Sequence, residues 1–414
     1  MAVKEEKRKS VSLANEYDWE RVRSQFNLSD DYIHLGTSQF ISSIPKPVRK
    51  AITEHRKALD KNPALYTLEK ENSCMQEARN AAAHYLAIDN PDNIAMTDST
   101  TMGLGLIYTA LNLKPGQEVL TSNDEHYSHH EAIRWATQRT GTSFRKISLY
   151  QDLSKVTQQE MVEAVIKEIK DHTRVVGLTW VHSSTGLKIP AAPIGKAIAQ
   201  LNQQRDKDNK ILFVLDAVHG FGIELETFPE LSCDFFIAGC HKWLYGPRGT
   251  GLVAATTQAW QTVTPVIPSF TEAMDLAIEE GEKPDQIDGK AMTPGGFHTL
   301  EYRWALKEAF EFMQTIGKER VYERVHALNR QCKEGLAAMP HVTLHTPLAD
   351  ELSSGIVAFE VKGKTAAETV QALVEKKIVA TESPYTPSYA RFTPGIYNTP
   401  EEVEQALAAV QALQ

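Results

Sequence analysis

The chain has 414 residues, a formal net charge of −9 and 42% apolar residues, which is the composition of a globular protein that buries a large core without disulfide or metal staples. At this length we expect two domains, or three small ones. The acidic balance argues against a nucleic-acid-binding protein, because phosphates are bound by a basic face, and we expect neither a secretory signal nor a membrane span.

The cysteines indicate a reducing compartment. Cys74, Cys233, Cys240 and Cys332 show no CxxC or other close spacing, which argues against a disulfide framework or a zinc site. We therefore expect a cytoplasmic protein.

Residues 1–16 contain a run of charged side chains and no apolar stretch, so we expect them to be disordered.

Residues 49–298 are predicted to form a large α/β domain, and residues 17–48 to pack on a smaller domain or bridge to it. Between about residues 90 and 255, short apolar runs alternate with helical patterns. Most of the runs are apolar throughout, which is typical of strands buried on both faces of a mostly parallel sheet. The predicted strands are Ile94–Thr97, Glu118–Thr121, Val175–Leu178, Ile211–Leu215, Phe235–Ala238 and Leu252–Ala255.

Helical patterns lie between these strands. Thr157 and Glu160 have the spacing of a capping box, and an apolar stripe follows up to Ile169. Pro193 suits the first position of another helix, and a further helical run covers residues 102–113.

From about residue 300 the pattern changes. Helical stretches are predicted at residues 299–313 and 320–339, a strand near residues 355–361, a helix near residues 366–375 and a last helix from Pro400. Residues 299–414 are therefore expected to form a smaller α+β domain.

Common nucleotide-binding and hydrolase motifs are not found. The sequence has no GxxxxGK[ST], no GxGxxG and no GxSxG, which argues against a P-loop protein, a Rossmann dinucleotide site and an α/β-hydrolase.

Two charged residues follow predicted strands of the same sheet. Asp216 ends one apolar run, and Lys242 comes just after another and precedes a loop with Gly246 and Pro247. Ligands of open α/β sheets bind beyond the carboxyl ends of the strands. A Schiff-base lysine and an acid for the pyridinium nitrogen are what pyridoxal 5′-phosphate (PLP) requires. The alternative for Lys242 alone is a loop lysine that extends its amine to water.

The segment Thr97–Thr101 is a candidate for holding the phosphate of this cofactor. It ends a predicted strand and opens a predicted helix, so that hydroxyls and helix N–H groups form an anion site. The alternative is an ordinary N-cap.

With these residues the sequence resembles the class V aminotransferases of PLP fold type I, and among them the isopenicillin N epimerase-like branch, over roughly residues 18–412. The resemblance implies a large domain with a mostly parallel sheet of seven-stranded type and a smaller α+β C-terminal domain. It identifies Lys242 as the catalytic Schiff-base residue, with Asp216 facing the pyridine nitrogen and His219 the phenolic oxygen. The resemblance assigns further cofactor contacts: His126 stacks on the ring, Ser183 lies near the phenolate and the substrate carboxylate, and Thr100, Thr101 and His241 bind the phosphate.

Two more matches concern the substrate and a second subunit. Arg391, before a Tyr-Asn-Thr sequence, resembles the family's clamp for the substrate carboxylate, a role that suits the planar guanidinium fork. Thr293 matches a segment that reaches the phosphate of the neighbouring subunit, which implies a homodimer with shared active sites. At Gly239 the chain departs from the many relatives that have serine, and we expect the N–H of Cys240 or a water to replace the missing hydroxyl.

The resemblance implies a PLP-dependent enzyme that acts at Cα of an α-amino acid through a Schiff base on Lys242 and a quinonoid intermediate. We expect an aminotransferase or an epimerase. A β-eliminating C–S lyase is the alternative in the same family, and a catalytically inactive PLP-fold binding protein is the alternative of another class. No cysteine follows Cys332, so we expect no protein persulfide of the kind that cysteine desulfurases form.

His126, His129 and His130 have a spacing that could hold a metal on a helix. The neighbouring acidic residues do not continue that helix face, so we expect no metal site.

Overall fold

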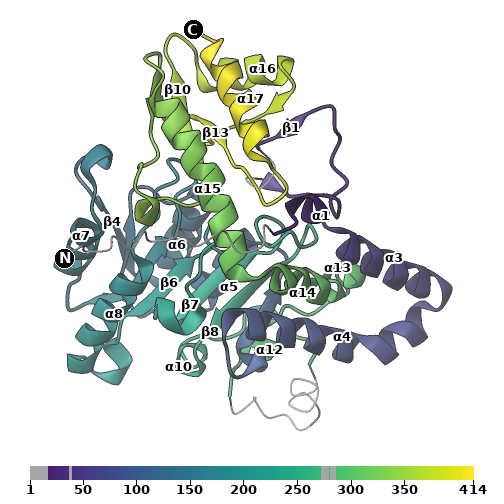
Figure 1. The fold of residues 1–414 in the computed structure, drawn as a ribbon. Coiled ribbons are helices and arrows are strands. Elements are labelled where there is room, and N and C mark those ends of the chain that lie inside the picture. Colours follow the sequence, from purple (N-terminus) through teal and green to yellow (C-terminus); the bar gives the residue numbers. More distant parts are fainter. Residues whose placement is uncertain (1–16, 37–39, 272–278, 280–285) are drawn as a thin grey trace, which may run out of the picture.

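The structure, a computed structural model, describes residues 17–36, 40–271, 279 and 286–414 (Figure 1). The predicted disorder of residues 1–16 lies outside this part of the chain. A seven-stranded sheet with the strand order β2-β8-β7-β6-β5-β3-β4 forms the centre. Its strands are β2 (Ile94–Thr97), β3 (Glu118–Ser122), β4 (Ser143–Ile147), β5 (Thr173–Thr179), β6 (Leu212–Asp216), β7 (Phe235–Gly239) and β8 (Gly251–Ala255).

The central sheet is mostly parallel. β4, β3, β5, β6 and β7 run parallel to one another, and β8 is antiparallel to both β7 and β2. The predicted α/β class is therefore confirmed, and all six predicted strands are present. Of the seven strands in this sheet, only β4 was not predicted. It lies at the sheet edge, carries Arg145 and Lys146, and is half exposed, so it has no apolar run.

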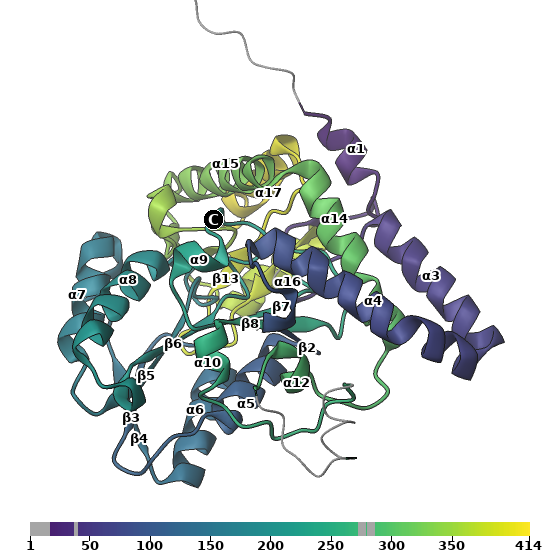
Figure 2. The ribbon, with the colours of Figure 1, turned by 90° about the horizontal axis from the view of Figure 1, so that it is seen from below.

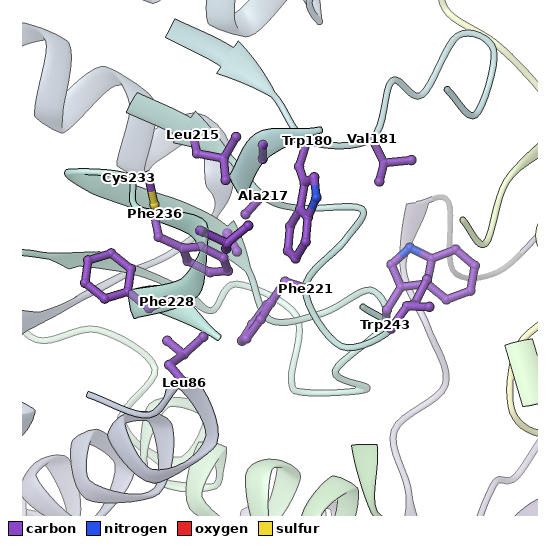
Figure 3. Close-up of a cluster of buried hydrophobic side chains, with 14 of the residues drawn as sticks. Leu86, Trp180, Val181, Leu215, Ala217, Phe221, Phe228, Cys233, Phe236 and Trp243 are labelled. Carbon is purple, nitrogen blue, oxygen red and sulfur yellow. The ribbon is translucent and has the colours of Figure 1, made fainter. Parts of the chain in front are cut away.

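Successive side chains of the inner strands point into two different cores. Phe235 belongs to a core shared with α5 (Thr100–Ala110) and α6 (Tyr127–Thr140). Phe236 belongs to the larger core on the opposite face, where its ring contacts Trp180 and Phe221 edge to face (Figure 3). Burial on both faces explains why these strands are apolar throughout.

Two helices on the larger core differ in detail from the prediction: α7 (Gln158–Glu168) in its cap and α8 (Ala191–Leu201) in its first residue. Thr157 caps α7 by accepting the N–H of Glu160, but the Glu160 side chain accepts from the N–H of Gln151 and does not close the predicted box. α8 begins two residues before Pro193. The first N–H groups of a helix have no partner within it, so proline is tolerated as the third residue.

The C-terminal part contains a four-stranded antiparallel sheet with the order β12-β13-β10-β9. Residues of the long helix α15 (Lys318–Ala337), and of α16 (Ala366–Glu375) and α17 (Pro400–Gln411), share a core with this sheet. Figure 1 shows α15 running from the large domain to the C-terminal sheet. The strands are β9 (Val342–Leu344), β10 (Val357–Val361), β12 (Thr381–Glu382) and β13 (Ala390–Phe392).

The N-terminal segment contacts both domains. From α1 (Trp19–Arg23), Arg23 pairs with Glu402 at 2.7 Å, and β1 (Ile33–His34) pairs in parallel with β11 (Ile378–Val379). Farther along, the N–H of Ser42 donates to the carbonyl of His241 in the large domain.

Four helices pack together beside the large domain (Figure 2). They are α3 (Lys46–Lys61), α4 (Pro63–Leu86), α13 (Leu300–Trp304) and α14 (Leu306–Ile316). Leu306 and Phe310 of α14 lie in the larger core of the large domain, although the predicted small domain begins at residue 299. The described residues also contain shorter helices: η1 (Pro91–Asn93), η2 (Leu153–Lys155), η3 (Asn202–Gln204), η4 (Lys207–Asn209), α9 (Phe228–Leu231), α10 (Thr257–Trp260), α12 (Gly289–Met292) and η5 (Asp350–Leu352).

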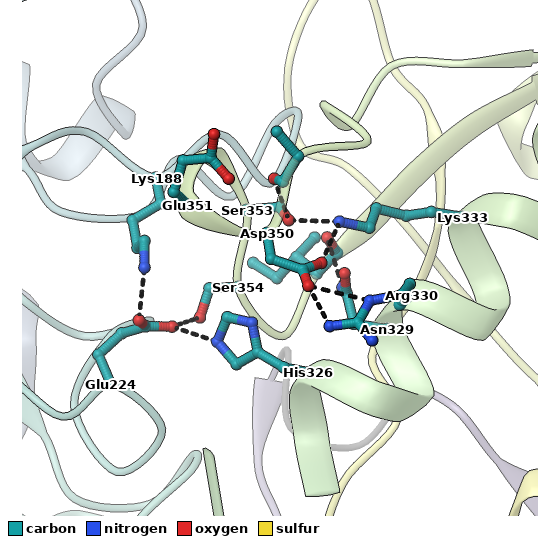
Figure 4. Close-up of polar contacts among 12 residues, drawn as sticks. Lys188, Glu224, His326, Asn329, Arg330, Lys333, Asp350, Glu351, Ser353 and Ser354 are labelled. Carbon is teal, nitrogen blue, oxygen red and sulfur yellow. Dashed lines mark hydrogen bonds and ion pairs between the residues drawn. The ribbon is translucent and has the colours of Figure 1, made fainter. Parts of the chain in front are cut away.

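A buried polar cluster joins the two domains (Figure 4). The Glu224 carboxylate accepts from Lys188 Nζ at 2.7 Å and from Ser354 Oγ at 2.5 Å, and lies 3.0 Å from His326 Nε2 on α15. Burial opposes ionisation, but the contacts with His326 and Lys188 hold the pKa of Glu224 below its ordinary value.

In the described part of the chain, no helix has the length and apolar surface needed to span a membrane.

Candidate active site

The predicted site residues converge on one cavity of about 170 Å³. It lies beyond the carboxyl ends of β5, β6 and β7, where the first turn of α5 and the segment before β13 also meet. Of the ten predicted residues only Thr293 is outside its lining. The other nine line it: Thr100, Thr101, His126, Ser183, Asp216, His219, His241, Lys242 and Arg391.

Lys242 follows β7 and faces a neutral imidazole. Its Nζ lies 3.2 Å from His219 Nε2, and burial lowers the pKa of Lys242 to about 8 although the Asp216 carboxylate opposes this. The indole N–H of Trp243 donates to His219 Nδ1 at 3.4 Å, so in the neutral ring Nε2 carries the proton and donates it to the neutral form of the Lys242 amine. Burial, followed by the charge of Lys242, keeps the pKa of His219 well below its ordinary value. A lysine amine with a lowered pKa is available as a nucleophile near neutral pH.

Asp216 is the last residue of β6 and is 2% exposed. Its Oδ1 accepts from the N–H of Val218 at 3.1 Å, and the strand register places Thr179 of β5 beside it. Burial raises the pKa of Asp216. A buried carboxyl group of this kind is a strong partner for a positively charged ring nitrogen.

A chain of buried polar groups supports this end of the cavity. Glu125 accepts from Ser122 Oγ at 2.7 Å and from the hydroxyl of Thr179, and its Oε2 lies 3.2 Å from His129 Nδ1. His129 Nε2 in turn lies 2.8 Å from the hydroxyl of Tyr108. Burial opposes ionisation of Glu125, yet the contacts with His129 lower its pKa to about 2. His129 is thus committed to this chain of contacts, and no cluster of His, Cys, Asp and Glu suited to a metal occurs among the described residues.

The first turn of α5 lies at one end of the cavity. Ser99 caps the helix by accepting the N–H of Met102. Thr100 Oγ1 accepts the N–H of Gly239 at 2.7 Å, which leaves its hydroxyl proton to donate. The N-terminus of a helix favours a bound anion. A Cβ at position 239 would lie 2.9 Å from His241 Cε1, so glycine makes room for the His241 ring.

The expectation for Cys240 was wrong. Its N–H donates to the carbonyl of Thr250 at 3.0 Å and cannot replace a phosphate-binding hydroxyl. The pairing of β7 with β8 ends at this point, and the bond between Cys240 and Thr250 continues it by one residue.

Arg391 on β13 is fully buried and lines the cavity. Its Nη1 donates to the carbonyl of Ser183 and its Nη2 to the carbonyl of Glu382, both at 2.6 Å, while Nε has no hydrogen-bond partner within the described residues. Burial lowers the pKa of Arg391 to about 10, so it is a cation at neutral pH. The two carbonyls fix the guanidinium plane, and its remaining N–H groups suit a carboxylate.

His126 lines the cavity, and Tyr385 contacts two of the lining residues, His126 and Ser183. His126 is the N-cap of α6, with Nδ1 2.7 Å from Ser128 Oγ. Burial and the charge of Lys242 lower its pKa to about 4, so the ring is neutral and suited to stacking.

Tyr385 was missed by the sequence analysis. Its hydroxyl lies 2.7 Å from Ser183 Oγ, and its ring centroid lies 6.0 Å from that of His126. Burial raises the pKa of Tyr385, so the hydroxyl stays protonated. No sequence motif marks this residue, because the fold of the segment between β12 and β13 is what brings it here.

Thr293 lies apart from the cavity. Its hydroxyl donates to the carbonyl of Gly289 at 2.9 Å and accepts from the N–H of Met96 at 3.1 Å and from Arg79 Nη2 at 3.2 Å. Its own N–H donates to the carbonyl of Lys290. A role of Thr293 toward a neighbouring subunit would therefore require it to exchange one of these bonds.

Comparisons with known proteins found a matching family model and several relatives with similar sequences. The family model described as aminotransferase class-V matches residues 37–406. Isopenicillin N epimerase of Streptomyces clavuligerus is 26% identical over 96% of this chain and 98% of that protein. A cysteine desulfurase of Klebsiella pneumoniae is 24% identical over 84% of this chain and 85% of that protein.

Solved structures show the same fold. The cystine C–S lyase C-DES, solved with its reaction product cysteine persulfide, superimposes with a TM-score of 0.82 at 20% identity, over 92% of this chain and 98% of that one. The apo cysteine desulfurase of Thermococcus onnurineus superimposes with a TM-score of 0.82 at 21% identity, over 97% of this chain and 99% of that one. The predicted fold type I is confirmed.

Proposed function

The chain belongs to the aminotransferase class-V family, whose cofactor is PLP, and on this premise we propose that it acts at Cα of an α-amino acid, as an aminotransferase or an epimerase. The observation that carries the proposal is the meeting of Lys242, Asp216 and Arg391 in one cavity. PLP supplies an electron sink for the charge that develops when a bond to Cα breaks. The residues fit this cofactor, because a lysine of lowered pKa, a strand-end carboxyl and a hydroxyl-lined helix N-terminus surround the same space.

Each residue has a role in this proposal. Lys242 holds the cofactor covalently and, once a substrate amine has replaced it, moves the proton between its Nζ and Cα. Asp216 pairs with the ring nitrogen, and His219 donates from Nε2. Arg391 binds the substrate carboxylate and so orients the bonds at Cα. The phosphate contacts are assigned to Thr100, Thr101 and His241, the ring contact to His126, and a contact near the carboxylate to Ser183.

A β-eliminating C–S lyase is the second candidate, supported by the sequence similarity to cysteine desulfurases. No cysteine is found among the described residues that line the cavity. Cys332 is buried in α15, and burial raises its pKa to about 12. Because the thiolate is the reactive form, we propose that sulfur, if released, leaves as a small molecule and not as a protein persulfide.

Product analysis with a panel of L- and D-amino acids separates these outcomes. Transamination yields a 2-oxo acid and consumes an amino acceptor, epimerisation yields the mirror-image amino acid, and β-elimination releases the β-substituent with ammonia. Lys242→Ala should abolish every one of these products. A PLP-loaded protein that releases none of them would contradict the proposal and favour a binding protein.

We also propose a homodimer with shared active sites. Large apolar side chains are exposed on α4, where Leu65 and Leu68 are 71% and 84% exposed, and beside Thr293, where Phe297 is 79% exposed. Exposed apolar patches of this kind mark contacts between proteins.

The four cysteines are all free thiols, which supports the proposed cytoplasmic location.

Mixing experiments test the shared site. Heterodimers of Lys242→Ala and Thr293→Ala chains should regain activity, because both changes fall in one of the two sites and leave the other complete. Verified heterodimers without activity would show that each chain builds its own site.

A further inference from the structure

A second cavity, of about 520 Å³, lies at the amino ends of β5 and β6. The cavity of Lys242 lies beyond the carboxyl ends of the same two strands, so the two are at opposite edges of the sheet. Among the charged side chains that line the second cavity, cations outnumber carboxylates, although the chain as a whole has a net charge of −9. Four cations, Lys114, Arg174, Lys207 and Lys210, face two carboxylates, Asp208 and Asp234.

Arg174 is placed in this cavity by an irregularity of the sheet. Thr173 pairs with Glu118 and Val175 with Val119, so Arg174 is the extra residue of a β-bulge. Bulges redirect a side chain away from the regular alternation of a strand. Arg174 is only 9% exposed, and its Nη1 is buried without a hydrogen-bond partner in the part of the chain that the structure describes.

Arg205, a nearby arginine, differs from Arg174 in its hydrogen bonds. Arg205 donates to four backbone carbonyls around the same strand ends, those of Lys170, Asp171, Thr173 and Asn209. That is the pattern of a guanidinium that holds the fold together. Arg174 has no such bond or ion pair among the described residues, and a buried charge without a partner destabilises the folded state.

The two carboxylates of the cavity attract the Arg174 guanidinium electrostatically, but neither forms a hydrogen bond or ion pair with it among the described residues. Asp234 Oδ2 accepts from the N–H of Phe213 at 2.8 Å, and Asp208 lies 4.0 Å from Lys114. The four cations of the lining outnumber these two carboxylates, so the described residues leave an excess of positive charge in the cavity.

We propose that this cavity binds a phosphate-bearing small molecule, with the Arg174 guanidinium donating to the phosphate oxygens and Lys207 and Lys210 beside it. The excess of two positive charges in the lining matches a phosphate dianion. A guanidinium fork donates two parallel hydrogen bonds to phosphate. The site is separate from the proposed active site and does not depend on the function proposed for it.

Inorganic phosphate, added to the PLP-loaded enzyme, is the probe. A ligand that binds only the folded state stabilises it, so phosphate should raise the melting temperature more than acetate or chloride at equal ionic strength. Isothermal titration should show one phosphate bound per chain. Arg174→Met should weaken this binding at least about 10-fold and should raise the melting temperature in phosphate-free buffer, because it removes an unpaired buried charge.

Two further variants complete the test. Lys210→Gln changes an exposed side chain at the rim and should also weaken phosphate binding. Arg139→Met removes an exposed arginine on α6, outside the cavity. It should change neither the affinity for phosphate nor the melting temperature in phosphate-free buffer. Equal stabilisation by phosphate and chloride, equal binding of acetate, or unchanged phosphate affinity in Arg174→Met or in Lys210→Gln would overturn the proposal.

Discussion

At the scale of single residues, burial sets the charge states around Lys242. It lowers the pKa of Lys242 to about 8 and that of His126 to about 4, and it raises the pKa of Asp216. The predicted strand ends indicated that Asp216 and Lys242 meet, and the resemblance to class V aminotransferases added His126. The sequence could not predict their charge states or the contact between Tyr385 and Ser183, since both depend on packing between distant segments.

The lowered pKa of Lys242 predicts its reactivity. In the apoprotein, the rate at which trinitrobenzenesulfonate labels Lys242 should rise with a midpoint near pH 8, because only the neutral amine reacts. Peptide mapping by mass spectrometry gives the rate for each lysine. Lys307, whose pKa is raised by its hydrogen bond with Glu77, is the control and should be labelled only at higher pH. A midpoint for Lys242 equal to that of Lys307 would refute the effect of burial.

At the scale of secondary-structure elements, burial also decided what could be predicted. Strands buried on both faces were found from their apolar runs, whereas the edge strand β4 was not, because it has no such run. Helix starts were predicted less well. The capping pattern at Thr157 was only half realised, since Glu160 bonds to Gln151, and Pro193 lies inside α8 and not at its first position.

The position of α5 on the sheet depends on one of its two glycines. A Cβ at Gly103 would lie 2.6 Å from Ile237 Cγ2, whereas a Cβ at Gly105 would meet nothing within 4 Å. Gly103→Ala should therefore destabilise the protein by about 1–3 kcal/mol through overpacking. Gly105→Ala should stabilise it by about 0.5–1 kcal/mol, because alanine is the better helix former. Urea unfolding measures both, and equal effects of the two changes would contradict this account of the helix.

At the scale of the whole molecule, the cluster around Glu224 couples the domains. Its partners Lys188 and His326 come from the large domain and from α15 (Figure 4). Glu224→Gln leaves the buried ammonium group of Lys188 without its counter-charge, and breaking such a pair costs about 3–5 kcal/mol. Urea unfolding at pH 7 should show this loss. Glu54→Gln, in the exposed pair with Lys50, is the control and should have little effect.

The effect of Glu224 should also depend on pH. Its folded-state pKa lies below its ordinary value, so the stability from its contacts is complete above that ordinary value and is lost as the pH falls through the lower, folded-state value. The difference between wild type and Glu224→Gln should therefore shrink in acid. A difference that stays constant from pH 7 to pH 3 would show that the charge of Glu224 does not matter.

The central claim is that Lys242 holds PLP. Borohydride reduction of the purified, PLP-loaded protein, followed by digestion and mass spectrometry, tests it most directly. We predict a pyridoxyl group on Lys242 and no fixed cofactor in Lys242→Ala. A pyridoxyl group on another lysine, such as the buried Lys188, or a protein that binds no PLP, would contradict the claim.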